Sequence, residues 1–207
     1  MQPIIDVAAL DGLRDYFHRF PDNSKVAMRI AINDTVKGKG MALIKNYMTD
    51  EISFNKSYLT GDRLGVAKLA TNENPEAIIR SRDRATSLAR FATSSAVGRG
   101  PEAGVTVRVK KGKTTFIKKG WLVRLNKGAS KSEDHYNLGL AVRLAPGEST
   151  LANKKTTHQS WLVKGSVALL YGPSVAQVFN DTRSKVTEPF GNLVQAEFLR
   201  QLSRLIE

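Results

Sequence analysis

Hydrophobic residues in the first part of the chain recur at the three- and four-residue spacing of helices. Residues 10–20 form one short amphipathic pattern, which predicts a helix that a proline ends. A second pattern follows, and Asn23 or Ser24 is placed to cap the helix that it predicts. Gly38 and Gly40 weaken the middle of this second helix, but the helical spacing resumes after them.

The hydrophobic period changes to two after a Gly- and Pro-rich turn region at residues 98–104. Alternation of apolar with polar or small residues is typical of half-buried antiparallel strands that are joined by short turns. Such alternation occurs in residues 105–109, 121–125 and 138–143, and residues 167–171 predict a further strand.

The last part of the chain returns to helical spacing. A helical stretch follows the turn at residues 171–175 and is expected to end near Val178 or Phe179. Glu188 and Pro189 are then expected to open a last helix, which has apolar residues on one face.

These patterns predict an α+β fold, in which a small antiparallel β-sheet is flanked by N-terminal helices and a C-terminal helix. The chain has 207 residues, of which 41% are hydrophobic, and this suffices for one domain with a real core. Phe116, Trp121 and Trp161 are candidates for core or subunit contacts, and the core is expected for each. The predicted parts of the single domain over residues 1–207 are a mainly helical region at 1–97, a β-rich region at 104–171 with a polar loop at 145–159, and a C-terminal helix at 185–207.

Positive charge is concentrated in the middle of the chain. The formal net charge is +13, and residues 76–131 alone hold 14 basic and 3 acidic side chains, a net of +11. The segments before and after this block are each +1. Such a block favours a polyanionic neighbour, either nucleic acid or an acidic protein surface, although a solvated face that keeps the protein soluble explains it as well.

Clustered cations in this block are candidates for contact with phosphate, because phosphate contacts need only positive charge and carry no sequence preference. On alternate strand positions, the later cations would line one exposed face of a hairpin. No zinc finger, RNP motif or basic zipper accompanies them. The candidate DNA- or anion-contacting residues are Arg80, Arg84, Arg108, Lys110, Lys111, Lys113, Lys118 and Lys119, with Arg82 and Arg90 close to the first two in sequence.

No motif in the sequence supports catalysis, a metal site or a cofactor, so we expect none of the three. Gly112-Lys113-Thr114 is like the end of a phosphate-binding loop, but Val107 stands where that loop requires glycine. The three histidines are scattered, and the absence of cysteine excludes thiolate ligands and a cysteine nucleophile. A carboxylate pair that only folding brings together is left open.

The sequence also gives no sign of a membrane protein or of an exported one. No apolar run approaches the roughly 20 residues that a membrane-spanning helix requires. Residues 1–10 carry an acidic side chain and no basic region, unlike a secretory signal. We therefore expect a protein that is made and assembled in the cytoplasm, with no membrane partner.

Short stretches follow one another in a distinctive order along nearly the whole chain. Those in the first half are Ala31-Ile32-Asn33, Tyr58-Leu59, Asp62-Arg63-Leu64, Val66-Ala67, Pro75-Glu76-Ala77-Ile78-Ile79 and Leu88-Ala89-Arg90-Phe91. Those in the second half are residues 104–109, 121–125, 137–143, 170–175 and 177–179. In this order and spacing the chain resembles the phage minor tail protein Z family, within the broader group of head-tail and tail-completion proteins of tailed bacteriophages. The polar stretch at residues 145–159 departs from the resemblance.

The resemblance implies a structural virion protein, namely a minor tail or tail completion component at the head-proximal end of the tail. It implies a homo-oligomeric ring, with a hexamer favoured, that helps to join head to tail and to pass the DNA. The implied partners are other phage tail and neck proteins and, nonspecifically, genomic DNA. The family has no catalytic motif to carry over, so the resemblance assigns no active site. The implied location is the virion tail, after assembly in the host cytoplasm.

Two other classes of function stay open at this point. A standalone nonspecific nucleic-acid-binding protein would explain the basic block, although no groove-reading motif supports it. An enzyme that the tail carries, such as a nuclease or a peptidoglycan hydrolase, would need a carboxylate or histidine constellation that the sequence does not display.

Overall fold

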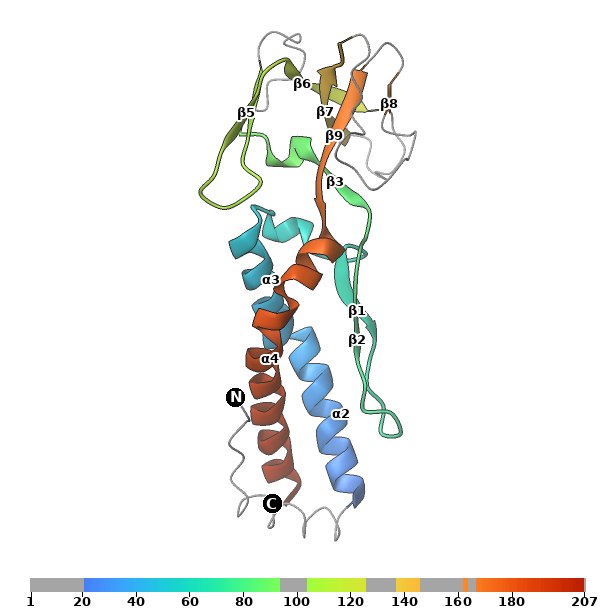
Figure 1. Ribbon diagram of the computed structural model, residues 1–207. Helices are drawn as coiled ribbons and strands as arrows, with labels where there is room; N and C mark the ends of the chain where they lie inside the picture. Colours follow the sequence, from blue (N-terminus) through green and yellow to red (C-terminus); the bar gives the residue numbers. More distant parts are fainter. Residues whose placement is uncertain (1–20, 94–103, 126–136, 146–161, 164–166, 207) are drawn as a thin grey trace. The chain divides into compact units, whose positions relative to one another are not determined.

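The computed structural model describes residues 21–93, 104–125, 137–145, 162–163 and 167–206. The fold is α+β, as predicted, because helices accompany small antiparallel sheets (Figure 1). The predicted helix over residues 10–20 lies outside the described residues, and so does the predicted polar loop from residue 146 onward. None of the described helices is long and apolar enough to cross a membrane.

The chain divides into two compact units. The first unit comprises Met1–Asn46, Leu64–Arg80 and Arg183–Glu207, and the second unit comprises Tyr47–Arg63 and Ser81–Thr182. Helix α3 (Lys39–Glu51) and helix α4 (Val175–Ile206) each contribute residues to both units. The prediction that residues 1–207 act as one tail-completion-type domain stays a prediction.

Helix α2 (Pro21–Lys37) begins before the predicted caps, Asn23 and Ser24. Proline suits the first turn of a helix, because the N–H groups there have no carbonyl partner within the helix. The helix ends where Gly38 was predicted to weaken it, and α3 follows directly. Glycine loses more conformational freedom in a helix than other residues do, so the interruption falls at this position.

Helix α4 is a single helix, whereas the sequence predicted one stretch that ends near Phe179 and a separate helix from residue 185. Val178, Thr182 and Val186 are buried and recur every four residues, so they continue one helical face through a polar sequence. The Thr182 hydroxyl also donates to the Val178 carbonyl at 3.0 Å. The proline that was expected to open the last helix therefore lies inside α4.

The region predicted to be mainly helical, residues 1–97, also contains strands. After α3 come the short 3-10 helix η1 (Lys56–Tyr58), strands β1 (Leu64–Lys68), β2 (Ile78–Ser81) and β3 (Ala85–Ser87), and the 3-10 helix η2 (Leu88–Phe91). Strands β1 and β2 pair as a two-stranded sheet. These strands are too short for a period of two to stand out from a loop in the sequence.

In the first unit, α2 packs against the later turns of α4. Ala27 and Ala31 of α2 are completely buried and cluster with Phe198 and Leu202 of α4. Met28 is partly buried against the same cluster. Alanine at two positions one turn apart lets the two helix backbones approach closely, and the larger side chains of α4 fill the space.

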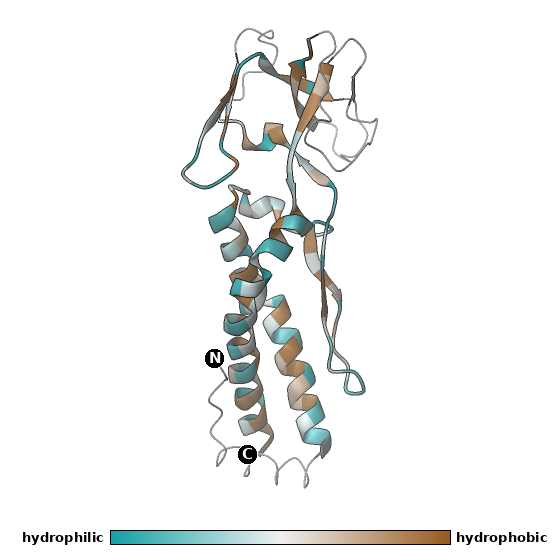
Figure 2. Ribbon diagram, in the orientation of Figure 1, coloured by the Kyte–Doolittle hydropathy of each residue, from teal (hydrophilic) through white to brown (hydrophobic). Residues whose placement is uncertain are grey.

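The largest sheet belongs to the second unit. Its strand order is β3-β9-β7-β6, and β8 also pairs with β9. The neighbouring strands are antiparallel, and in their register Leu122 pairs with Leu140, which pairs in turn with Leu170. Figure 2 shows hydrophobic residues along β7 and β9, both of which the sequence predicted as strands. Besides β3, the strands of this sheet are β6 (Gly120–Leu125), β7 (Asn137–Arg143), β8 (Leu162–Val163) and β9 (Val167–Ser174).

Two further strands of the second unit, β4 (Val105–Val107) and β5 (Thr115–Ile117), form a separate antiparallel hairpin. Val105 and Val107 are buried on one side of it. The described strands thus form three small sheets, where the sequence predicted one.

Candidate anion-binding surface

The β4–β5 hairpin carries most of the predicted cations, but at its turns instead of along a strand face. Strand β4 ends at Val107 and β5 begins at Thr115, so the segment between them is a loop. Figure 2 shows that this loop is largely hydrophilic. Gly112 turns this loop with a φ of +77°, a conformation that costs glycine little. The Lys113 N–H closes the turn on the Lys110 carbonyl at 3.2 Å. The predicted alternation of cations along an exposed sheet face is therefore wrong.

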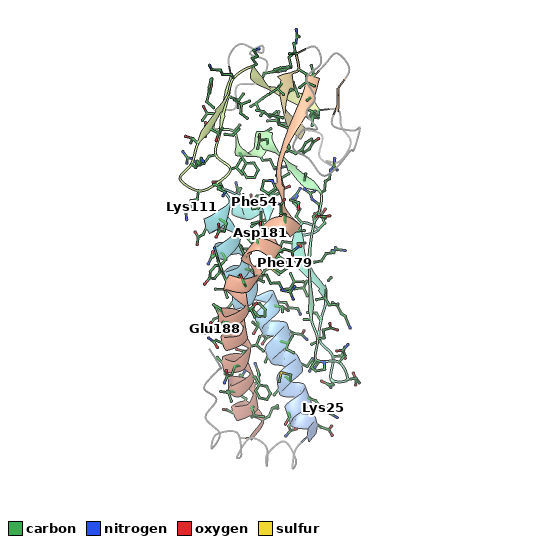
Figure 3. All side chains as sticks on the ribbon, viewed as in Figure 1. Lys25, Phe54, Lys111, Phe179, Asp181 and Glu188 are labelled. Carbon is green, nitrogen blue, oxygen red and sulfur yellow. The ribbon has the colours of Figure 1, made fainter. Side chains whose placement is uncertain are left out.

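Six of the eight predicted cations lie on this hairpin and the turn that follows it, and all six are exposed. They are Arg108, Lys110, Lys111, Lys113, Lys118 and Lys119. Lys111, labelled in Figure 3, forms an ion pair of 2.6 Å with Asp50 of α3. The other five are exposed and have no ion pair with any residue that the structure describes.

The remaining two predicted cations lie elsewhere. Arg84 is exposed in the second unit, immediately before β3. Arg80 is exposed in β2 and belongs to the first unit. The structure does not bring either of them into the hairpin.

Phe116 of β5 is 57% exposed, which corrects its expected place in the core. Its ring lies over the backbone of Gly104, where an added Cβ would come within 2.2 Å of Phe116 Cζ. The ring therefore packs against Gly104 and stays partly open to solvent. Proteins that bind single-stranded nucleic acid combine exposed aromatic rings with cations, and this hairpin carries both. Trp121 is half-buried in β6, and Trp161 lies outside the described residues.

A second group of cations surrounds Tyr58 of η1, and we call Arg63, Arg82 and Arg90 the arginine triad. Their guanidinium carbons lie 4.6, 5.8 and 4.5 Å from the centre of the Tyr58 ring, in that order. Arg82 also donates from Nη2 to the Tyr58 hydroxyl at 2.6 Å. Cation–π contacts of this kind contribute roughly 0.5–2 kcal/mol each, depending on their exposure.

The backbone brings the triad together from separate parts of the chain. Arg63 immediately precedes β1, and Arg82 immediately follows β2. The Arg82 N–H donates to the Arg63 carbonyl at 2.9 Å, so the two residues pair at the base of that hairpin. Arg90 comes from η2.

Beneath the triad lies a buried aromatic cluster that fixes the position of Tyr58. The Phe54 ring stacks on Tyr58 with centres 5.8 Å apart and meets the Phe91 ring at 5.6 Å. All three rings are buried. The hydroxyl of Tyr58 also lies 3.4 Å from Thr86 Oγ1. The ring contacts and the hydroxyl contact together fix the Tyr58 side chain, on which the three arginines lie.

The triad has no carboxylate counterpart among the described residues. None of its members forms an ion pair there. Arg90 is exposed as a whole residue, but partial burial of its guanidinium lowers its pKa, the phenol of Tyr58 acts in the opposite sense, and the like charges of Arg63 and Arg82 add to the lowering. Arginine nevertheless stays charged at any physiological pH. Three positive charges therefore lie around one tyrosine without compensation from the described part of the protein.

The hairpin and the triad share the same supporting structure. The Arg108 N–H donates to the Phe91 carbonyl at 2.8 Å, directly after Arg90 in the chain. The Val109 carbonyl accepts from the Ser53 N–H at 2.7 Å, next to Phe54 (labelled in Figure 3). The two cationic groups are thus built on one aromatic cluster within the second unit.

Sequence reasoning found Arg82 and Arg90 but missed Arg63 and Tyr58. Arg63 is isolated from the basic block along the chain, and only the pairing at the base of the β1–β2 hairpin brings it beside Arg82. The available signal was an arginine on each side of a short hairpin, with an aromatic residue shortly before the first. Among the described residues, no group of three His, Asp or Glu side chains could hold a metal ion.

Comparison of the chain with models of protein families, with curated proteins and with solved structures found no match.

Proposed function

We propose that this chain is a structural virion protein of a tailed bacteriophage, a minor tail component at the head-proximal end of the tail. It forms a homo-oligomeric ring there, helps to join head to tail, and lets the DNA pass. It has no enzymatic role. This proposal rests on the ordered stretches that resemble the minor tail protein Z family.

One structural observation supports the use of those stretches as evidence: they supply many of the buried residues. Each stretch could have fallen on exposed loops, where similarity says little about fold. Instead most of them, all but residues 66–67 and 75–79, contain residues that are at most 4% exposed: Ala31, Leu59, Leu64, Phe91, Val105, Val107, Leu122, Leu140, Ala141, Val175 and Val178. Residues that fill a close-packed core constrain a fold more than surface residues do.

In this role the basic hairpin contacts DNA that passes through the ring. Contacts of lysine and arginine with backbone phosphates release counterions and do not depend on base sequence, which suits a conduit for a whole genome. The partners besides DNA are other tail and neck proteins. An acidic surface of such a protein is the other polyanion that would suit the hairpin.

A stop codon at Lys25, in the phage genome that encodes this chain, tests the proposal. Electron microscopy of the lysate should then show filled heads beside unjoined or malformed tails, and the infectivity count should collapse. A plasmid copy of the intact gene should restore both, whereas a copy with the same stop codon should not. Particles of normal shape and normal infectivity without the protein would refute the tail role.

The alternative is a standalone nonspecific nucleic-acid-binding protein. The observation that favours it is the gathering of six exposed cations and an exposed Phe116 on one hairpin. Titration of the purified protein with DNA, together with charge reversal at Arg108, Lys110 and Lys111, measures this activity directly. Tight DNA binding combined with normal virions in the stop-codon experiment would favour the alternative.

A further inference from the structure

The arginine triad concentrates positive charge where part of it is withdrawn from water. Arg63 and Arg82 are half-buried, and each has a buried Nε atom with no hydrogen-bond partner among the described residues. Placing like charges together and removing polar groups from water both oppose folding. Tyr58 offsets only part of that cost. Its ring has two faces for three cations, and its hydroxyl accepts a hydrogen bond from one of them.

We propose that the arginine triad of Arg63, Arg82 and Arg90 on Tyr58 is a binding site for one phosphate group. A bound anion supplies the negative charge that the described part of the chain lacks. Exposed Arg90 lies at the open side of the site, and its guanidinium is held within 4.5 Å of the Tyr58 ring centre. Binding therefore needs little ordering of that long side chain, which is the usual entropic cost.

Phosphate suits three arginines better than a carboxylate does. A carboxylate presents two oxygens in one plane, and a single guanidinium fork satisfies both. A phosphate group presents oxygens in several directions, so guanidinium groups that approach from different elements can each donate to it. Arg82 has one Nη committed to the Tyr58 hydroxyl, which leaves Arg63 and Arg90 as the principal donors.

The site does not depend on the tail role, because it is built within the second unit from η1, η2 and the base of the β1–β2 hairpin. Two ligands could supply this phosphate group: a free phosphate ion, or the backbone of a nucleic acid. Exposed Arg108, directly after β4, favours the second source, since its N–H is hydrogen-bonded to the carbonyl of Phe91, next to Arg90.

Nuclear magnetic resonance of the arginine side chains in the full chain tests the proposal. Inorganic phosphate is added at constant ionic strength, with chloride as the exchanged anion. The Nε–H signals of Arg63 and Arg82 are suitable reporters, because their nitrogen atoms are buried. We expect saturable shifts of the triad signals with one phosphate per chain. No shift, or the same shift with chloride, would overturn the proposal.

Substitutions then assign the site. Arg90→Gln and Arg63→Gln should each weaken phosphate binding about tenfold or more, the usual effect of losing one charge-assisted hydrogen bond. Arg84→Gln is the matched control, since Arg84 is a nearby exposed arginine with no described contact to Tyr58. Circular dichroism checks that each variant folds. If Arg63→Gln does not fold, phosphate binding by Arg90→Gln, a change at an exposed residue, tests the assignment. Equal binding by Arg90→Gln and Arg84→Gln would also overturn the assignment.

A duplex oligonucleotide distinguishes the sources. If it displaces phosphate and shifts the same signals, the site holds a backbone phosphate, and Arg90→Gln should lower the salt dependence of DNA binding by about one phosphate contact. If phosphate binds and the duplex leaves the triad signals unchanged, the site takes the free ion. Binding of a glutamate-rich peptide in place of both would mean that the triad recognises a protein, contrary to the proposal.

Discussion

The Asn33 side chain of α2 holds the backbone of Ala70 by two hydrogen bonds. Its amide nitrogen donates to the Ala70 carbonyl at 3.0 Å, and its carbonyl oxygen accepts from the Ala70 N–H at 2.9 Å. The amide thus offers the same donor and acceptor pair that a neighbouring strand would offer. The chain that follows β1 is thereby fixed to α2 within the first unit.

Substitution of Asn33 by alanine should destabilise the protein. It leaves the N–H and carbonyl of Ala70, a residue only 4% exposed, without partners, at a cost of about 1–3 kcal/mol in the free energy of unfolding. Urea denaturation measures the loss. Asn72→Ala is the matched control, because Asn72 only accepts one exposed hydrogen bond from Arg29 and should change stability by no more than about 0.5 kcal/mol. Equal losses in both variants would contradict the role of Asn33.

Gly40→Ala should destabilise the first unit although alanine favours helices. An added Cβ at Gly40 would lie 2.5 Å from Phe190 Cε2 and 2.7 Å from the Thr35 carbonyl oxygen. Overpacking costs about 1–3 kcal/mol, more than the roughly 1 kcal/mol gained in helix propensity. Calorimetry should therefore show a lower melting temperature.

The control for this substitution is Gly191→Ala in α4, since no atom lies within 4 Å of a Cβ added there. That change should raise the stability by up to about 1 kcal/mol. If the two glycine substitutions had the same effect, close contact between Gly40 and Phe190 would be refuted.

The ion pair between Glu197 and Arg200 should make stability depend on pH. Hydrogen bonds from Arg200 lower the pKa of Glu197, and Gln201 contributes in the same direction. A depressed folded-state pKa stabilises the protein above the unfolded pKa of about 4.3, and the contribution is lost as the pH falls through the folded value. Wild type should thus exceed Glu197→Gln in urea midpoint at neutral pH, and the difference should shrink in acid. Glu188→Gln, at an exposed position of the same helix, is the control and should change the urea midpoint at neutral pH by less than Glu197→Gln does.

The lysines of the hairpin region should set the salt dependence of DNA binding. Each of Lys113, Lys118 and Lys119 that neutralises a phosphate contributes about 0.9 to the slope of log affinity against log salt, so glutamine substitutions should reduce that slope stepwise. Fluorescence anisotropy with duplex DNA measures it. Lys25→Gln in the first unit, where Lys25 pairs with Asp22 at 3.5 Å, should leave the slope unchanged. An identical slope in all four variants would exclude the hairpin as the DNA contact.

Patterns with many repeats were predictable from sequence, and short or nonlocal features were not. The strands at Val105, Trp121 and Leu138 follow from their period of two, the strand at Val167 was predicted without such alternation, and the weak point at Gly38 follows from glycine alone. In contrast, β1, β2 and β3 were missed because a few residues cannot establish a period.

The candidate site divides in the same way. The cations of the hairpin are neighbours in sequence, so composition alone revealed them. The arginine triad depends on a backbone hydrogen bond between Arg63 and Arg82 and on the place of η2 beside Tyr58. Such proximity is a property of topology, which neither charge counts nor periodicity contain.

The discontinuous first unit also has a consequence during protein synthesis. Ala27 and Ala31 leave the ribosome early, but Phe198 and Leu202, which cover them, are translated only after the entire second unit. Contacts so distant in sequence form late, and exposed apolar faces of unfinished chains are prone to aggregation. The apolar face of nascent α2 therefore lacks its cover from α4 until the second unit has been translated, and this interval is when the chain is most exposed to aggregation.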